Sequence, residues 1–313
     1  WNNITSKEFH QNFVIPGIPV IIKNFPSKAK DLWTPEFFSN NYGEHEIEVA
    51  NTNILSTLRM NISRYFEAHG PKGDPERGDD VWYIRALSDI FDKYPELNEM
   101  LGHRKFDDYM KARFITAQIF VGMTSTSGTS YHCANFNNLF FQIKGKKKWT
   151  FVSPHYNALM YPMFNEKSMD VASFLSTIVL KSPEDMEKYF PLYKFAPKMV
   201  ATLEPGDVLM NPPWQWHMIE NLEPVSIAVA TRWFLTPGQQ YQNSVHSTLQ
   251  FLSPYIWGLY YQKIVNLERG IHAHKASNTP PIDERFNFGK KGSAASYIPR
   301  IFPPRIYEEN NNK

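Results

Sequence analysis

Two histidines in this chain stand in contexts that suit a metal ion, and an alanine stands where a third ligand is expected. His132 lies within the run 129–147, and His217 ends the run 206–217. Oxygen-activating Fe(II) sites commonly use two neutral imidazoles and one carboxylate on one face of the metal. Residues i and i+2 of a strand point the same way, so His132 and Ala134 are expected to face inward together. Ala134 offers no donor atom.

The composition of the chain limits the class of protein to which it can belong. The chain has 313 residues, of which 42% are hydrophobic and 15% aromatic, as in a globular protein. A formal charge of only +2 gives no indication of nucleic-acid binding. The single cysteine, Cys133, excludes an intrachain disulfide and a thiolate zinc site, and it is expected to point away from His132. The lack of a cysteine pair favours a reducing intracellular compartment. A soluble protein is favoured because the apolar run 249–261 is too short to span a bilayer.

The elements that must position the histidines are mainly strands. Short runs rich in aromatic and β-branched residues, separated by turn residues, are typical of a jelly-roll or cupin barrel. The predicted barrel strands are Ile115–Met123, Asn138–Ile143, Lys147–Val152, Met199–Leu203, Asp207–Met210 and Val225–Phe234. We therefore predict a mainly β fold with flanking helices, a double-stranded β-helix.

Other segments are expected to surround this barrel. The N-terminal α/β collar should contain strands at 20–23 and 81–84 and helices at 34–40, 88–94 and 95–101. A helical insertion is expected at 153–198, and a charged, Gly- and Pro-rich loop at 70–80. The predicted catalytic domain covers 1–237, with its barrel core at about 114–236. Residues 238–313 should form a helical pair, bent at Pro254, and a polar tail.

In order and spacing these motifs resemble the JmjC, or cupin-8, branch of the Fe(II)/2-oxoglutarate oxygenases, which includes the hypoxia-inducible factor asparaginyl hydroxylase. Thr129 precedes His132 by three residues, Asn138 follows it by six and Lys147 by fifteen, and the segment Gly-Asp-Val-Leu leads to Trp-His217. The resemblance covers about 20–234. It implies Fe(II) held by His132 and His217, with 2-oxoglutarate as cosubstrate.

The resemblance also implies roles around the cosubstrate. Lys147 is expected to pair with the distal carboxylate of 2-oxoglutarate, helped by the hydroxyl of Thr129, and Asn138 to line the pocket near the iron. Tyr83 is the candidate for a tyrosine that joins them from an early strand, and Arg232 is a second candidate anchor. On pattern alone, Lys147 is better explained as a solvated hairpin lysine beside Lys146 and Lys148.

Ala134 departs from the family pattern, and three explanations remain open. Halogenases of the wider superfamily carry Ala or Gly at this place, so that chloride or bromide occupies the vacant position and is transferred to the substrate. Alternatively, the chain keeps the barrel only to bind a protein partner. In the third explanation water, Asn135 or another carboxylate completes the metal shell and hydroxylation persists. An engineered residue at position 134 is a further alternative. We favour oxidation of an aliphatic C–H bond that ends in halogenation.

The substrate is the least specified part of this hypothesis. The loop 70–80 and the insertion 153–198 are the segments expected to cover the barrel mouth, and they mix aromatic residues with both signs of charge. That suits a small molecule, an amino acid or a peptide. Neither nucleic acid nor a membrane is an expected partner, and the C-terminal helical pair 238–313 is a candidate homodimer interface.

Overall fold

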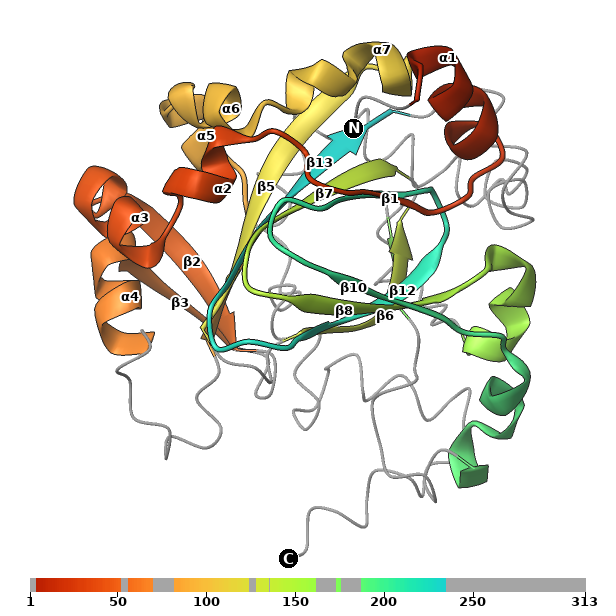
Figure 1. The fold of residues 1–313 in the computed structure, drawn as a ribbon. Coiled ribbons are helices and arrows are strands. Elements are labelled where there is room, and N and C mark those ends of the chain that lie inside the picture. The colour runs from red at the N-terminus through yellow and green to blue at the C-terminus, as the bar shows by residue number, and fades with distance from the viewer. Residues whose placement is uncertain are drawn as a thin grey trace, which may run out of the picture.

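The fold was analysed in a computed structural model of the chain, and it is built on two antiparallel sheets. The structure describes residues 4–51, 56–69, 82–123, 128–134, 136–161, 173–175 and 187–234. The larger sheet has the strand order β1-β11-β7-β13-β5-β4-β2-β3, and the smaller has the order β10-β8-β12-β6-β9. The sheets face each other and enclose the barrel (Figure 1). The predicted jelly-roll fold is confirmed.

The strands occupy most of the predicted runs. Their bounds are β1 Val20–Ile22, β2 Glu46–Asn51, β3 Ser56–Asn61, β4 Trp82–Leu87, β5 Phe114–Gly122, β6 Gly128–Ala134, β7 Asn137–Lys144, β8 Lys147–Val152, β9 Ser173–Leu175, β10 Met199–Leu203, β11 Val208–Asn211, β12 Trp216–Asn221 and β13 Ser226–Trp233. The hairpin β2–β3 extends the larger sheet and was not predicted. The insertion was predicted to be helical, and this was wrong for β9, which pairs with the edge of β6.

The helices cover the outer face of the larger sheet and the outer side of the smaller one. They are α1 Ser6–Phe9, η1 His10–Val14, α2 Lys28–Leu32, α3 Pro35–Tyr42, α4 Ile62–His69, α5 Asp89–Lys93, α6 Glu96–Leu101, η2 His103–Phe106, α7 Asp107–Met110, η3 Pro154–Met160 and η4 Pro191–Phe195. Helix α3 begins as predicted, because Thr34 caps it by accepting a hydrogen bond from the Phe37 amide at 3.1 Å. No helix within the described ranges is long and apolar enough to cross a bilayer.

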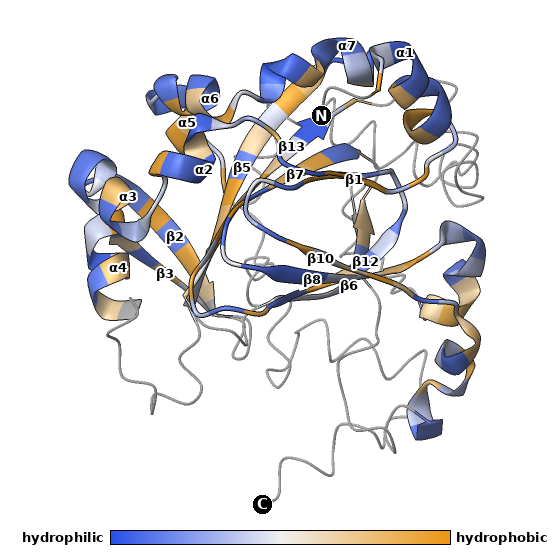
Figure 2. Ribbon diagram, viewed as in Figure 1, coloured by the Kyte–Doolittle hydropathy of each residue, from blue (hydrophilic) through white to orange (hydrophobic). Residues whose placement is uncertain are grey.

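Three hydrophobic clusters hold these layers together. The largest fills the space between the helices and the larger sheet, where the helices turn apolar residues toward the strands (Figure 2). A second cluster lies on the outer face of the smaller sheet and includes Tyr131, Cys133 and Trp216. The third fills the barrel interior, where Phe140 and Trp149 meet edge to face. Strand β7 is buried along nearly its whole length because it separates two of these clusters.

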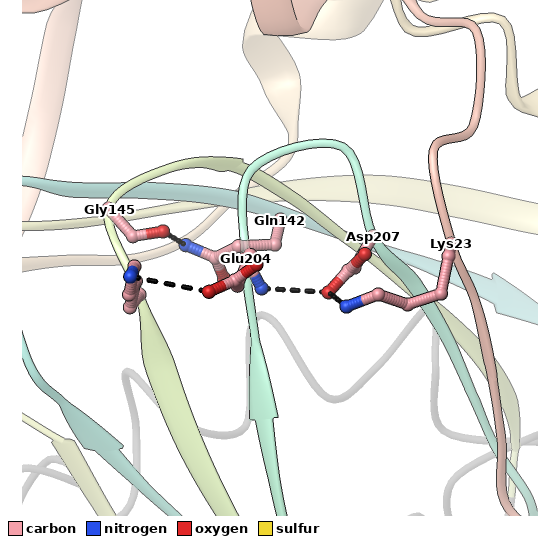
Figure 3. Close-up of polar contacts among 6 residues, drawn as sticks. Lys23, Gln142, Gly145, Glu204 and Asp207 are labelled. Carbon is pink, nitrogen blue, oxygen red and sulfur yellow. Dashed lines mark hydrogen bonds and ion pairs between the residues drawn. The ribbon is translucent and has the colours of Figure 1, made fainter.

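Polar contacts join the turn before β11 to Lys23, which follows β1 (Figure 3). The buried carboxylate of Asp207 accepts hydrogen bonds from the Lys23 ammonium at 2.6 Å and from the Glu204 amide at 2.8 Å. On the other side Gln142 donates to the Gly145 carbonyl at 2.9 Å. Asp207 therefore shapes the turn before β11.

The C-terminal helical pair and the loop 70–80 lie outside the described residues.

Substitution of Asp207 tests how much these contacts contribute to stability. We expect Asp207→Ala to lower the free energy of unfolding by about 1–3 kcal/mol, because it leaves the partly buried Glu204 amide without its acceptor. Lys23→Met keeps the amide contact and removes only the half-exposed ammonium, so its loss should be smaller, although the buried carboxylate then lacks its cation. Urea unfolding of both variants measures the difference. Equal losses would show that the amide contact is unimportant.

Candidate metal centre and cosubstrate pocket

The two predicted metal ligands face each other across neighbouring strands. His132 on β6 is the register partner of His217 on β12, and their ring centroids lie 4.1 Å apart. Cys133 points to the opposite face, where it is buried in the outer cluster, as predicted. The rings are thus close enough to share one ion.

Hydrogen bonds determine which nitrogen of each imidazole ring is available to bind a metal ion. Nδ1 of His132 lies 2.9 Å from the Ser130 carbonyl oxygen, and Nδ1 of His217 lies 2.8 Å from that of Gln215. A carbonyl oxygen only accepts, so each Nδ1 carries the proton. Each Nε2 therefore keeps its lone pair, which is the form that ligates a metal. The indole of Trp149 stacks on His217, with centroids 5.2 Å apart, and restricts its rotation.

Burial keeps both imidazoles neutral. Desolvation lowers the pKa of His132 to about 4, although backbone hydrogen bonding opposes this shift. Desolvation and the charge of His132 lower the pKa of His217 well below its ordinary value. Neutral rings are what Fe(II) requires, and here they stay neutral into mildly acidic solution.

Ala134 leaves the donor set one ligand short. It ends β6 two residues after His132, and its carbonyl accepts a hydrogen bond from the Trp214 amide at 2.7 Å. Glu220 does not replace the missing acid, because its carboxylate pairs with Lys148 at 2.9 Å. Among the described residues no three His, Cys, Asp or Glu side chains gather to hold a metal. Asn135, the other ligand considered, lies outside them.

Lys147 is buried inside the barrel rather than solvated. Its side chain is among the largest that are fully buried, with 1% of the residue exposed. Its ammonium donates to Oδ1 of Asn221 and lies 5.9 Å from the ring centroid of Tyr83. Burial lowers its pKa to about 7. No acidic partner for Lys147 is found in the described part of the chain, so an anionic ligand is the natural way to satisfy the ammonium.

Two further predicted pocket residues carry unsatisfied polar atoms. Oγ1 of Thr129 and Oδ1 of Asn138 are buried without a hydrogen-bond partner in the described structure. Buried polar atoms are normally paired, so such atoms indicate a place for a bound ligand. Tyr83 is buried and packs against Phe120 inside the barrel. These residues and Lys147 therefore fit a bound 2-oxo acid.

Arg232 lies apart from Lys147 in this arrangement. It is half-buried on β13, between Asn138 on β7 and Thr116 on β5, and its Nε donates to Oε1 of Gln118 at 3.2 Å. Its charge adds slightly to the effect of burial, which lowers the pKa of both metal-site histidines. Its predicted role as a cosubstrate anchor stays a prediction.

Two residues of the site, Asn221 and Trp149, were not predicted from the sequence. Both lie on the inward face of the smaller sheet. The even spacing of Asn221 from His217 and of Trp149 from Lys147 could have identified them, because side chains of a strand alternate between its two faces.

The depressed pKa values predict how stability depends on pH. In metal-free protein, the free energy of unfolding should fall between about pH 6.5 and 4, because the unfolded histidines take up protons and the folded ones do not. His132→Gln should make this fall shallower, measured by urea unfolding in chelator across that range. Exposed His155→Gln is the control and should keep the parent slope. An unchanged slope in His132→Gln would contradict a neutral, desolvated imidazole in the folded protein.

Comparison with known proteins places this geometry in a family. A family model described as a cupin-like domain matches residues 6–240. The HSPB1-associated protein 1 homolog of Danio rerio is 35% identical over 107 residues, which cover 34% of this chain and 23% of that protein. The bifunctional arginine demethylase and lysyl-hydroxylase psr-1 of Caenorhabditis elegans is 27% identical over 252 residues, covering 73% and 58%.

A third relative is named for a JmjC domain. JmjC domain-containing protein D of Dictyostelium discoideum is 23% identical over 237 residues, which cover 69% of this chain and 51% of that protein. In all three relatives the matched region is less than two thirds of the whole protein. The chain belongs to the cupin-like domain family, and its relatives there include JmjC proteins.

Proposed function

We propose that the protein is an Fe(II)- and 2-oxoglutarate-dependent enzyme that oxidises an aliphatic C–H bond. The observation that carries this proposal is the joint presence, in one barrel, of two converging neutral imidazoles and a buried lysine that lacks an acidic partner in the described residues. Bound iron with 2-oxoglutarate would supply oxygen activation, consuming O₂ and releasing succinate and CO₂. The names of two relatives, a hydroxylase and a JmjC protein, agree with this class.

His132 and His217 would hold the iron through Nε2. Their Nδ1–H groups donate to backbone carbonyls, which fixes both ring orientations before a metal arrives. Trp149 covers one face of His217 and excludes water from it.

Lys147 would bind the distal carboxylate of 2-oxoglutarate. Asn221 orients its ammonium, and the face of Tyr83 lies alongside it. An incoming carboxylate would form a charge-assisted hydrogen bond with a donor that is already desolvated and held in place. The hydroxyl of Thr129, which has no partner among the described residues, would donate to the same carboxylate, and Asn138 would line the pocket near the iron.

Lys147→Met should weaken 2-oxoglutarate binding by about 10- to 100-fold, the loss expected for one charged hydrogen bond. Isothermal titration of the Co(II)-loaded protein measures this dissociation constant. The matched control is Lys148→Met, because Lys148 points outward to Glu220 and should leave the constant within about two-fold. Equal effects of the two substitutions would contradict a cosubstrate role for Lys147.

Ala134 favours halogen transfer as the specific outcome. The overall reaction would join R–H, halide, a proton, O₂ and 2-oxoglutarate to give R–X, water, succinate and CO₂. A halide beside the iron would replace the charge that a carboxylate at 134 otherwise supplies. Hydroxylation, with R–OH as product, is the alternative if water or Asn135 completes the shell. A non-catalytic protein-binding module is the alternative if no metal is held.

The residues of the site specify the class of substrate less directly than the class of reaction. A small molecule, an amino acid or a peptide fits the proposal, and the relative named for arginine demethylation and lysyl hydroxylation favours amino-acid side chains. Homodimerisation through residues 238–313 stays a proposal.

Ala134→Asp separates these outcomes. We expect the introduced carboxylate to tighten Fe(II) binding at least about ten-fold and to abolish halogen transfer, because it takes the same coordination position. Metal titration and mass spectrometry of products from reactions with bromide measure the two effects.

Halogenation by Ala134→Asp at the parent level would contradict the halide position. Succinate without halogenated product in the parent would favour hydroxylation, and neither retained iron nor succinate would favour the binding module.

A further inference from the structure

Two arginines lie on the inward side of the larger sheet, and the proposed cosubstrate chemistry requires neither of them. On β13, Ala228 and Ala230 pack in the barrel interior. Side chains alternate along a strand, so Arg232, two residues further on, lies on the same inward side. Gln118 on β5 also lies inward, because it precedes the interior Phe120 by two residues. It accepts a hydrogen bond from Nε of Arg232 at 3.2 Å.

The second arginine, Arg85, lies on β4, which flanks β5 on the side opposite to β13. Tyr83 packs against Phe120 inside the barrel, whereas Ile84 packs outward under the helices. Arg85 therefore shares the inward side of Tyr83. Burial raises the pKa of Tyr83 and the charge of Arg85 opposes this shift, which agrees with that placement. An inward side chain that is still exposed, as Arg85 is, lies where the barrel opens.

Strand β4 contains a bulge directly after Arg85. One extra residue separates Ile84 from Leu87 relative to their partners on β5, and Ala86 there has a φ of 57°. The left-handed region is unfavourable for alanine. The bulge lets Leu87 return to the outer cluster while Arg85 stays inward. Bulges at the rims of barrels commonly orient a side chain in this way, and the strain at Ala86 favours a functional reason for this one.

Neither guanidinium has an acidic partner among the described residues. Arg59 and Arg104 each pair with a carboxylate, but Arg85 and Arg232 do not. Gln118 accepts only from Nε, so the terminal nitrogens of Arg232 still have protons to donate. Burial lowers the pKa of Arg232 to about 10, and the group stays charged at neutral pH. A partly buried cation is costly without a counter-charge, which a ligand in the barrel would supply.

We propose that Arg232 and Arg85 bind a carboxylate of the substrate, so that the enzyme acts on an acidic amino acid or an acidic side chain of a peptide. The proposal rests on the proposed function, because it assigns the substrate class of the same barrel. The fork of Arg232, oriented by Gln118, matches a planar carboxylate. Arg85 would attract the acidic group at the mouth and repel a basic side chain.

The test measures binding of small probes to the full chain, loaded with Co(II) and saturated with 2-oxoglutarate, by isothermal titration. The probes are free L-aspartate and three acetylated, amidated peptides Ala-Ala-X-Ala-Ala, in which X is Asp, Asn or Lys. The parent should bind the Asp peptide at least about ten-fold more tightly than the Asn peptide, as expected for one charged hydrogen bond. The Lys peptide should bind most weakly.

Variants locate this preference for Asp over Asn. Arg232→Gln should abolish most of it, and Arg232→Lys, which keeps the charge without the fork, should lie between Arg232→Gln and the parent. Arg85→Gln should weaken binding of the Asp peptide by about two- to five-fold, because solvent screens an exposed charge. The matched control is Arg59→Gln, which removes an exposed charge on β3 and should leave the preference unchanged.

The outcomes separate this inference from the proposed function. Binding of the Asp peptide alone supports a peptide substrate, and binding of L-aspartate alone supports a free amino acid. A parent that binds Co(II) and 2-oxoglutarate but neither acidic probe, or that prefers the Lys peptide, overturns the inference and leaves the proposed function intact. Weaker 2-oxoglutarate binding by Arg232→Gln with an unchanged preference for Asp also overturns it. Failure of the parent to bind Co(II) contradicts the proposed function itself.

Discussion

The pairing register of β6 against β12 is the constraint on which the site depends. It sets His132 opposite His217 and turns both rings into the barrel. Side chains alternate along a strand, so a slip by one residue would bring Tyr131 or Cys133 inward in place of the imidazole. The outer cluster resists that slip, because it already buries Tyr131 and Cys133 against Trp216. Apolar packing on one face of the small sheet thus fixes the chemistry on the other face.

Burial shapes the chemistry of every group in this barrel. It favours the neutral form of the two imidazoles, and it lowers the pKa of Lys147 to about 7. Arg232 keeps its charge at neutral pH. The two basic side chains have different partners, because Lys147 contacts Asn221 and Tyr83 whereas Arg232 donates to Gln118. An anionic ligand that pairs with Lys147 would stabilise its protonated form.

Sequence patterns predicted the parts of the fold that depend on local signals. The Thr34 cap and most barrel strands follow from capping and hydrophobic alternation, and the histidine pair follows from motif spacing. Strand β9 has three residues and depends on pairing with the edge of β6, which no local pattern encodes. The run of three lysines looked solvated, yet alternation sends Lys146 and Lys148 outward to acidic partners and turns Lys147 inward.

Ala134 alone is therefore weak evidence for a loss of function. A barrel that serves only to bind a partner gains nothing from a fully buried amine, or from the oxygens of Thr129 and Asn138 that find no partner among the described residues, because each destabilises the empty fold. Apolar residues of similar size would pack there at lower cost. These polar groups are accounted for if the barrel is normally filled by an anionic cosubstrate. On that argument the alanine changes which ligand completes the metal, while the pocket beside it keeps its purpose.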